Sequence, residues 1–118
     1  MLFKSNELEK VVREKPRGGP GKMDCLFAFQ MDKGPQGSAF QMVVYQTLEP
    51  GNGVGYHQHE DNEELYAIIS GNGTFTDNDR VEKVVGPGDI TLTLKGEWHG
   101  IINTGNEPLH FLAIIAKN

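Results

Sequence analysis

Cysteine is almost absent from this 118-residue chain, which contains Cys25 and no other. A single cysteine excludes an internal disulfide framework and suits a reducing compartment. It also excludes the cysteine-rich ligand sets that are usual for structural zinc sites. We interpret Cys25 as a small buried residue of a strand rather than as a reactive thiol.

Long apolar runs and an excess of positive charge are missing as well. No segment approaches the roughly 20 apolar residues that a membrane-spanning helix needs, and residues 1–7 lack the apolar core of a signal peptide. The 11 basic and 16 acidic residues give a net charge of −5, which argues against nucleic acid or an anionic membrane surface as a partner. We therefore expect a cytoplasmic protein without nucleic-acid or membrane partners.

The chain has the length of one domain, and its composition divides it into an N-terminal arm, residues 1–22, and a barrel domain, residues 23–118. Residues 5–15 are expected to form a short helix capped by Ser5, and the prolines and glycines at 16–21 end any regular structure. From residue 23 onward, short strand-like stretches alternate with turn clusters at intervals typical of a β-barrel. The expected strands are 23–31, 40–48, 54–59, 64–70, 73–77, 81–85, 89–94, 98–103 and 109–116.

The most informative pattern in the chain is a set of four candidate metal ligands: His57, His59, Glu64 and His99. Alternate residues of a strand share a face, so His57 and His59 project together, about 7 Å apart at the backbone. Glu64 and His99 would arrive from neighbouring strands. Imidazoles together with a carboxylate suit a divalent transition metal, and four protein ligands leave two cis positions of an octahedral shell open for substrate, water or dioxygen.

The spacing of these ligands resembles the two signatures of the cupin superfamily. Gly51-x5-His57-x-His59-x4-Glu64-x6-Gly71 is similar to the first signature at every fixed position, and Gly88-x5-Leu94-x-Gly96-x2-His99-x3-Asn103 is similar to the second. The second departs from the family at Leu94, where proline is usual, which affects the turn before His99 but no ligand. Two long gapped patterns in the right order are a specific signal.

The resemblance implies an all-β fold, the double-stranded β-helix or jelly-roll barrel of two antiparallel sheets, with the metal held inside. Glu63 is an alternative carboxylate ligand, and Glu64 is preferred because it fits both gaps of the first signature. The metal expected is one divalent transition metal per chain, with manganese or iron favoured and nickel, zinc, cobalt or copper also compatible. The resemblance does not imply one reaction, because the fold hosts many.

Strand parity predicts the lining of the pocket. If Glu64 and His99 face inward, so do Tyr66, Ile68, Ile101 and Asn103. For the strand 40–48, either Met42, Val44 and Gln46 or Gln41, Val43 and Tyr45 face inward, and we favour the first set. Tyr66 is interpreted either as core filling or as a proton donor, and is the one candidate for acid–base catalysis.

We expect a metalloenzyme that acts on a small oxygenated organic molecule by a dioxygenase-like or decarboxylase-like reaction. Alternatives are a non-catalytic sensor or carrier and, among enzymes, an oxalate-decarboxylase type or a sugar isomerase or lyase. The oxalate-decarboxylase hypothesis is weakened because arginine, which would bind a carboxylate, is nearly absent from the barrel: Arg80 lies in a hairpin turn. The expected partners are a small-molecule substrate and a second copy in a homodimer, with the arm adding a strand across the interface.

Overall fold

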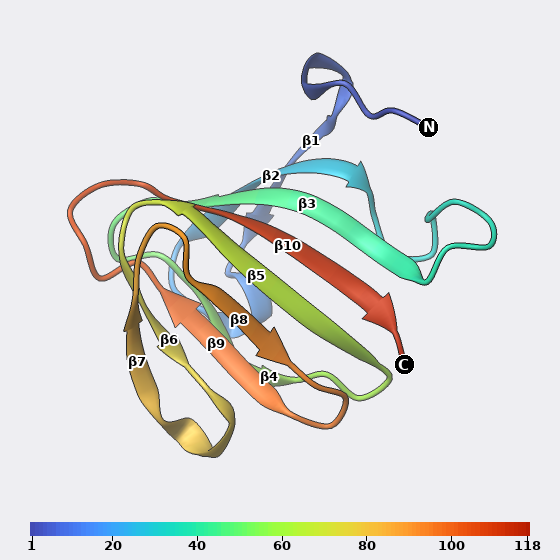
Figure 1. Ribbon diagram of the computed structural model, residues 1–118. Coiled ribbons are helices and arrows are strands. Elements are labelled where there is room, and N and C mark those ends of the chain that lie inside the picture. Colours follow the sequence, from blue (N-terminus) through green and yellow to red (C-terminus); the bar gives the residue numbers. More distant parts are fainter.

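The computed structural model describes residues 1–118 and has ten strands in two antiparallel sheets (Figure 1). The six-stranded sheet has the order β1-β2-β3-β10-β5-β8, and the four-stranded sheet has the order β4-β9-β6-β7. The strands are β1 (Glu9–Glu14), β2 (Lys22–Phe29), β3 (Phe40–Leu48), β4 (Gly53–Gln58), β5 (Asn62–Ser70), β6 (Gly73–Thr76), β7 (Glu82–Val85), β8 (Ile90–Thr93), β9 (Trp98–Ile102) and β10 (Leu109–Lys117). This confirms the expected all-β jelly-roll barrel, and each expected strand has a counterpart whose ends lie within two residues.

The helix predicted over residues 5–15 is wrong. Only a single turn of 3-10 helix, η1 (Ser5–Glu7), is present there, and β1 follows it and pairs with β2. The β-branched Val11 and Val12 prefer an extended backbone. Val11 lies opposite the buried Cys25 in this pairing, so burial against the barrel decides the conformation of the arm.

The core lies between the two sheets and is built by alternation along the strands. On β3 the buried side chains are Met42, Val44, Gln46 and Leu48, so this strand has the parity that we favoured. The opposite side chains of β3 point to the outer face of the sheet, where Tyr45 is 46% exposed. The largest fully buried side chains, which fill the centre of the barrel, are Tyr66, Phe111, Leu48, Ile101 and Leu109.

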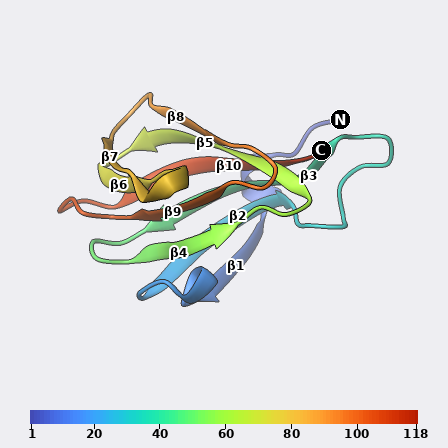
Figure 2. The same cartoon turned by 90° about the horizontal axis from the view of Figure 1, so that it is seen from below.

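A tight loop fastens the end of the arm to β4. It contains the 3-10 turn η2 (Pro16–Gly18), and Figure 2 shows this short turn on the same side of the molecule as β1, β2 and β4. Gly53 donates a backbone hydrogen bond to the carbonyl of Pro20 at 3.0 Å. A side chain at Gly55 would overlap the carbonyl oxygen of Arg17, so glycine is required where the loop crosses β4.

No helix in the structure is both long enough and apolar enough to cross a membrane. The three helical segments, η1, η2 and η3 (Asn78–Arg80), are single turns of three residues each.

Candidate metal centre

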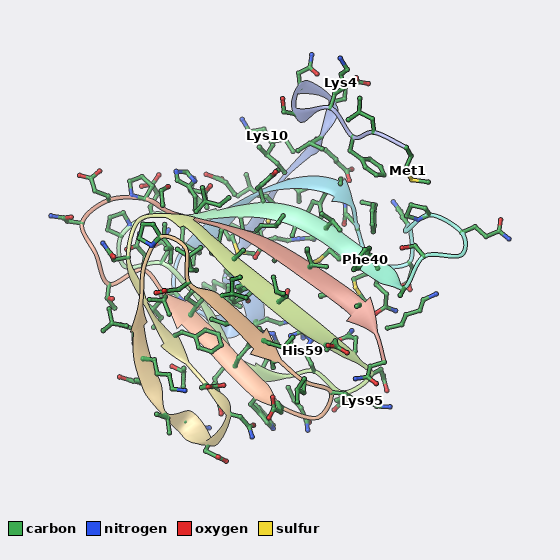
Figure 3. All side chains as sticks on the ribbon, in the orientation of Figure 1. Met1, Lys4, Lys10, Phe40, His59 and Lys95 are labelled. Atoms are coloured by element: carbon green, nitrogen blue, oxygen red, sulfur yellow. The ribbon has the colours of Figure 1, made fainter.

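Three strands and one loop bring the four predicted ligands together. His57 is near the end of β4, His59 follows in the next turn, Glu64 is on β5 and His99 is on β9. One ligand atom from each of the four lies within 4.8 Å of all the others. Figure 3 labels His59 at the end of the barrel next to the loop that carries Lys95, and the backbone of His59 is hydrogen-bonded to Glu97 and Gly96 of that loop.

Each histidine of the cluster has its Nδ1 atom held by an oxygen on the far side of the ring. The distances are 2.7 Å from His57 to the carbonyl oxygen of Gly55, 2.6 Å from His59 to Oδ1 of Asn62, and 2.8 Å from His99 to Oγ1 of Thr93. The backbone and amide oxygens accept the Nδ1–H proton, which leaves the lone pair of Nε2 free. Holding the outer ring nitrogen in this way is the usual means of fixing a metal-binding imidazole.

The inner atoms of the cluster are spaced as cis ligands of one ion. Oε1 of Glu64 lies 2.9 Å from Nε2 of His59 and 3.0 Å from Nε2 of His99, and the two Nε2 atoms are 3.0 Å apart. Two ligands at right angles on a metal with bonds of about 2.1 Å lie about 3.0 Å from each other. The donor set and its spacing therefore fit a divalent transition metal.

Burial and mutual contact set the charges of the cluster in the absence of a metal. Burial lowers the pKa of His57 to about 4, and the charges of His99 and Arg17 act in the same direction. Burial opposes ionisation of Glu64, yet its hydrogen bonds with His59 and His99 lower its pKa to about 2. For His59, burial is outweighed by the hydrogen bond and the charge of Glu64, which raise its pKa. His57 is therefore neutral at pH 7, Glu64 is an anion, and its contact with His59 favours the protonated form of that imidazole.

Tyr66 packs against the metal-ligand cluster. Its side chain is 2% exposed, and its ring stacks on that of His99 with centroids 5.0 Å apart and 23° between the planes. Burial, together with the charge of Glu64, raises its pKa well above 10. The hydroxyl therefore keeps its proton, so Tyr66 can act as a hydrogen-bond donor and not as a base.

A cavity of about 420 Å³ opens in front of the cluster. Of the predicted residues, Met42, Gln46 and Tyr66 line it together with His57, His59 and Glu64. The other predicted pocket residues lie elsewhere in the interior: Val44, Ile68, Ile101 and Asn103 are at most 3% exposed and are not part of the lining. For Ile68, Ile101 and Asn103 the reason is position along the strand, because parity decides which face a side chain occupies but not how close to the metal end of the barrel it lies. Val44 lies between Met42 and Gln46 on β3 and is covered by its neighbours.

Asn103 has a structural role. Its amide donates hydrogen bonds to the carbonyls of Leu48 and Glu107, and its Oδ1 accepts from the backbone of Gly105. This ties down the turn that follows β9. The carboxylate of Glu63, the alternative ligand, instead accepts a hydrogen bond from Asn118 at 3.1 Å, and the cluster contains Glu64.

Sequence reasoning missed the contribution of the arm to the cavity. The lining includes Met23, Cys25 and Phe27 of β2 and five consecutive arm residues, 13–17. Strand β2 carries no metal ligand, so strand parity could not show which of its side chains face the cavity. Arg13 and Arg17 are among these five, so arginine does reach the cavity, contrary to the expectation from the barrel alone. The one available signal was the concentration of basic residues at 10–22 in an otherwise acidic chain.

Comparison with known proteins gives a consistent result. Residues 44–115 match the family model described as Cupin domain. The chain is 36% identical over 115 residues to an oxalate-binding protein of Thermotoga maritima, covering 98% of this chain and 93% of that protein. It is also 34% identical over 80 residues to a gentisate 1,2-dioxygenase of a Ralstonia species, of which it spans only 22%.

Solved structures show the same relationship. The crystal structure of a predicted oxalate decarboxylase from Thermotoga maritima matches with a TM-score of 0.90 and 33% identity over the whole of both chains. A double-stranded β-helix protein from Klebsiella pneumoniae matches with a TM-score of 0.72, covering 98% of this chain and 89% of that one. At 22% identity, the second likeness bears on the fold alone.

Proposed function

This chain belongs to the cupin family, and on that basis we propose that it binds one divalent transition metal and, at that metal, a small carboxylic acid such as oxalate. The observation that carries the proposal is the convergence of three Nδ1-held imidazoles and Glu64, of which His57, His59 and Glu64 line a cavity that also receives arginine from the arm. Similarity to a protein named for oxalate binding supports the same ligand class.

His57, His59, Glu64 and His99 would hold the metal, which we propose to be manganese or iron because the site combines imidazoles with a carboxylate and contains no thiolate. When bound, such a metal supplies Lewis-acid chemistry and the capacity to engage dioxygen. Asn62 and Thr93 orient two of the imidazoles, and the buried anion of Glu64 offsets part of the positive charge.

The remaining residues of the cavity combine apolar surface with a hydrogen-bond donor. Met42, Val54 and Ile115 provide apolar surface, and Tyr66 can donate a hydrogen bond near the metal ligands. We propose the cytoplasm as its compartment, on the ground of the unpaired Cys25.

A catalytic role is a second candidate, favoured by the placement of Tyr66 in the cavity wall with its proton retained. A decarboxylase-like reaction would cleave the carbon–carbon bond of oxalate and consume one proton, giving formate and carbon dioxide. A dioxygenase-like reaction would instead consume dioxygen. A non-catalytic carrier or sensor would bind the acid and release it unchanged.

Titration calorimetry of oxalate into manganese-loaded and metal-stripped protein tests the proposal. We expect oxalate to bind the manganese-loaded protein and to bind the metal-stripped protein with at least tenfold lower affinity. Equal binding with and without metal, or none with metal, would refute it. Assaying the same mixtures for formate, with and without dioxygen, separates decarboxylation from simple binding, and Tyr66→Phe should slow turnover by a larger factor than it weakens oxalate binding.

A further inference from the structure

The arm places two cations without a protein partner, Lys15 and Arg17, along the metal-binding cavity, and of these only Arg17 also borders the depression outside it. Arg17 is exposed and lines both the main cavity and a shallow depression outside it that is bounded by His57, His59 and Glu60. It therefore stands where the interior meets solvent, beside two of the metal ligands. Any ligand that entered from this side would pass the guanidinium group.

The backbone that carries Arg17 is fixed rather than loose. Its φ of 52° is in the left-handed region, which non-glycine residues adopt only when the surroundings enforce it. Three contacts hold the backbone of Arg17 in this conformation. Pro16 is buried, Gly18 and Gly19 donate hydrogen bonds of 2.9 Å within the turn, and the carbonyl of Arg17 packs against Gly55. The side chain therefore starts from a set position above the site.

The guanidinium of Arg17 has no partner within the protein. Its neighbour in the arm, Arg13, donates a hydrogen bond to Gln30 at 2.9 Å and lies over the ring of Phe27 at 5.6 Å. By contrast, no ion pair, side-chain hydrogen bond or aromatic ring engages Arg17, although Glu14 lines the same cavity. Five N–H donors in a planar fork are thus available to an anion.

A second unpaired polar group faces the cavity from inside. Gln46 is 7% exposed, lines the cavity, and has an Oε1 atom without a hydrogen-bond partner. Buried polar atoms are normally satisfied. The cavity thus has metal ligands on one wall, and its other lining groups include a buried amide and an unpaired cation. A ligand with polar groups on more than one side would fit this lining.

We propose that Arg17 is the residue that selects dicarboxylates, by binding the carboxylate oxygens that the metal leaves uncovered. This rests on the proposed function, because it assumes that the acid binds at the metal. Bidentate pairing of a guanidinium with a carboxylate adds both affinity and orientation. A monocarboxylate bound through its one carboxylate group has no second carboxylate for Arg17, so the arginine should discriminate between oxalate and acetate.

The test uses manganese-loaded protein and titration calorimetry with oxalate and with acetate. Arg17→Gln removes the charge and the guanidinium fork but keeps an unbranched polar side chain with the same backbone requirement, and Arg17→Lys keeps the charge but not the fork. We expect Arg17→Gln to weaken oxalate binding about 10- to 100-fold, Arg17→Lys to weaken it less, and acetate binding to change less than about threefold in both. Manganese content should stay the same as in the wild type.

Arg13→Gln is the matched control, since it makes the same change at an arginine of the same cavity whose guanidinium is already engaged. It should leave oxalate affinity within about threefold of the wild-type value. If wild-type protein binds oxalate and Arg17→Gln binds it equally well while remaining folded and loaded, the role of Arg17 is refuted and the proposed function stands. If the loaded wild-type protein binds no oxalate, the proposed function fails, and this inference fails with it.

Discussion

Oε1 of Glu64 lies 2.9 Å from Nε2 of His59, with both side chains at most 5% exposed. Without a metal, this contact is a hydrogen bond that raises the pKa of His59 and helps to lower that of Glu64 to about 2. With a metal, the same two atoms are adjacent ligands. The proton and the metal therefore compete for one position.

The first prediction concerns this competition. Metal binding should release about one proton while His59 is protonated in the free protein, so affinity should rise with pH through its raised pKa and level off above it. His57, with a pKa of about 4, should not compete above about pH 5. Manganese titrations in two buffers of different ionisation enthalpy, between pH 5.5 and 8.5, measure the protons released. Affinity independent of pH across this range would contradict the assignment.

The second prediction concerns the residues that hold the imidazoles from behind. Thr93→Val removes the oxygen that holds Nδ1 of His99, at 2.8 Å, and leaves a side chain of nearly the same shape. Such outer partners typically contribute 10- to 100-fold to metal affinity, so we expect a loss of roughly 10-fold in a manganese competition titration. Thr91→Val, a neighbouring buried threonine of β8 whose hydroxyl has no partner, is the control and should change affinity less than about threefold.

The third prediction concerns Cys25. The side chain is fully buried, and burial raises the pKa of the thiol to about 11. Because the thiolate is the reactive form, the folded protein should resist alkylation by iodoacetamide at pH 8.5, whereas the protein unfolded in denaturant should be alkylated within minutes. Mass spectrometry over a time course measures this. Rapid labelling of the folded protein would show that the cavity exposes the thiol.

The metal ligands and the overall strand pattern could be predicted from the sequence because both depend on local spacing. His57 and His59 share a face through the strand period, and the gaps to Glu64 and His99 match a known pair of motifs. The strand β1 was not accessible, since the sequence around Val11 is compatible with a weak helix and only pairing with β2 decides between them. Local propensity is easily overridden in this way.

The cavity lining was predicted only in part, for a related reason. Parity identified Met42 and Gln46 as inward-facing, but it could not tell the metal end of the barrel from the far end, where Ile68 and Asn103 lie buried outside the cavity. The position of Arg17 at the cavity could not have been predicted from the spacing of residues in the sequence. Its position depends on contacts between the arm and Gly55, some 38 residues along the chain.

The fourth prediction concerns association, and we propose a homodimer through the outer face of the six-stranded sheet. Two cross-strand rows on this face are apolar over most of the sheet, although the first ends at Lys10 on β1, and the flanking rows carry polar residues such as Asp24 and Glu63. Because a two-fold contact would place these apolar rows against the same rows of a second copy, the second copy is the partner that the face suits. The rows are Leu26, Tyr45, Leu112, Ala67 and Ile90, and Val43, Ile114, Leu65 and Leu92.

Sedimentation velocity at micromolar concentration tests the dimer. We expect the wild type to sediment as a dimer and Leu112→Lys, at the centre of the face, to sediment as a folded monomer. Val84→Lys adds the same charge at a residue of β7 that is 81% exposed in the other sheet, and should leave the dimer intact. A monomeric wild type would contradict the proposal.

The most direct test of the account is the metal content of protein produced without an affinity tag or added metal. The geometry of His57, His59, Glu64 and His99 predicts about one equivalent of a divalent transition metal per chain in the wild type, which the proposed function takes to be manganese or iron, and less than a tenth of that in His57→Ala. Circular dichroism should show that the variant keeps its β structure. Wild-type protein that holds no metal even after reconstitution, or His57→Ala that holds as much as the wild type, would contradict the four-ligand site.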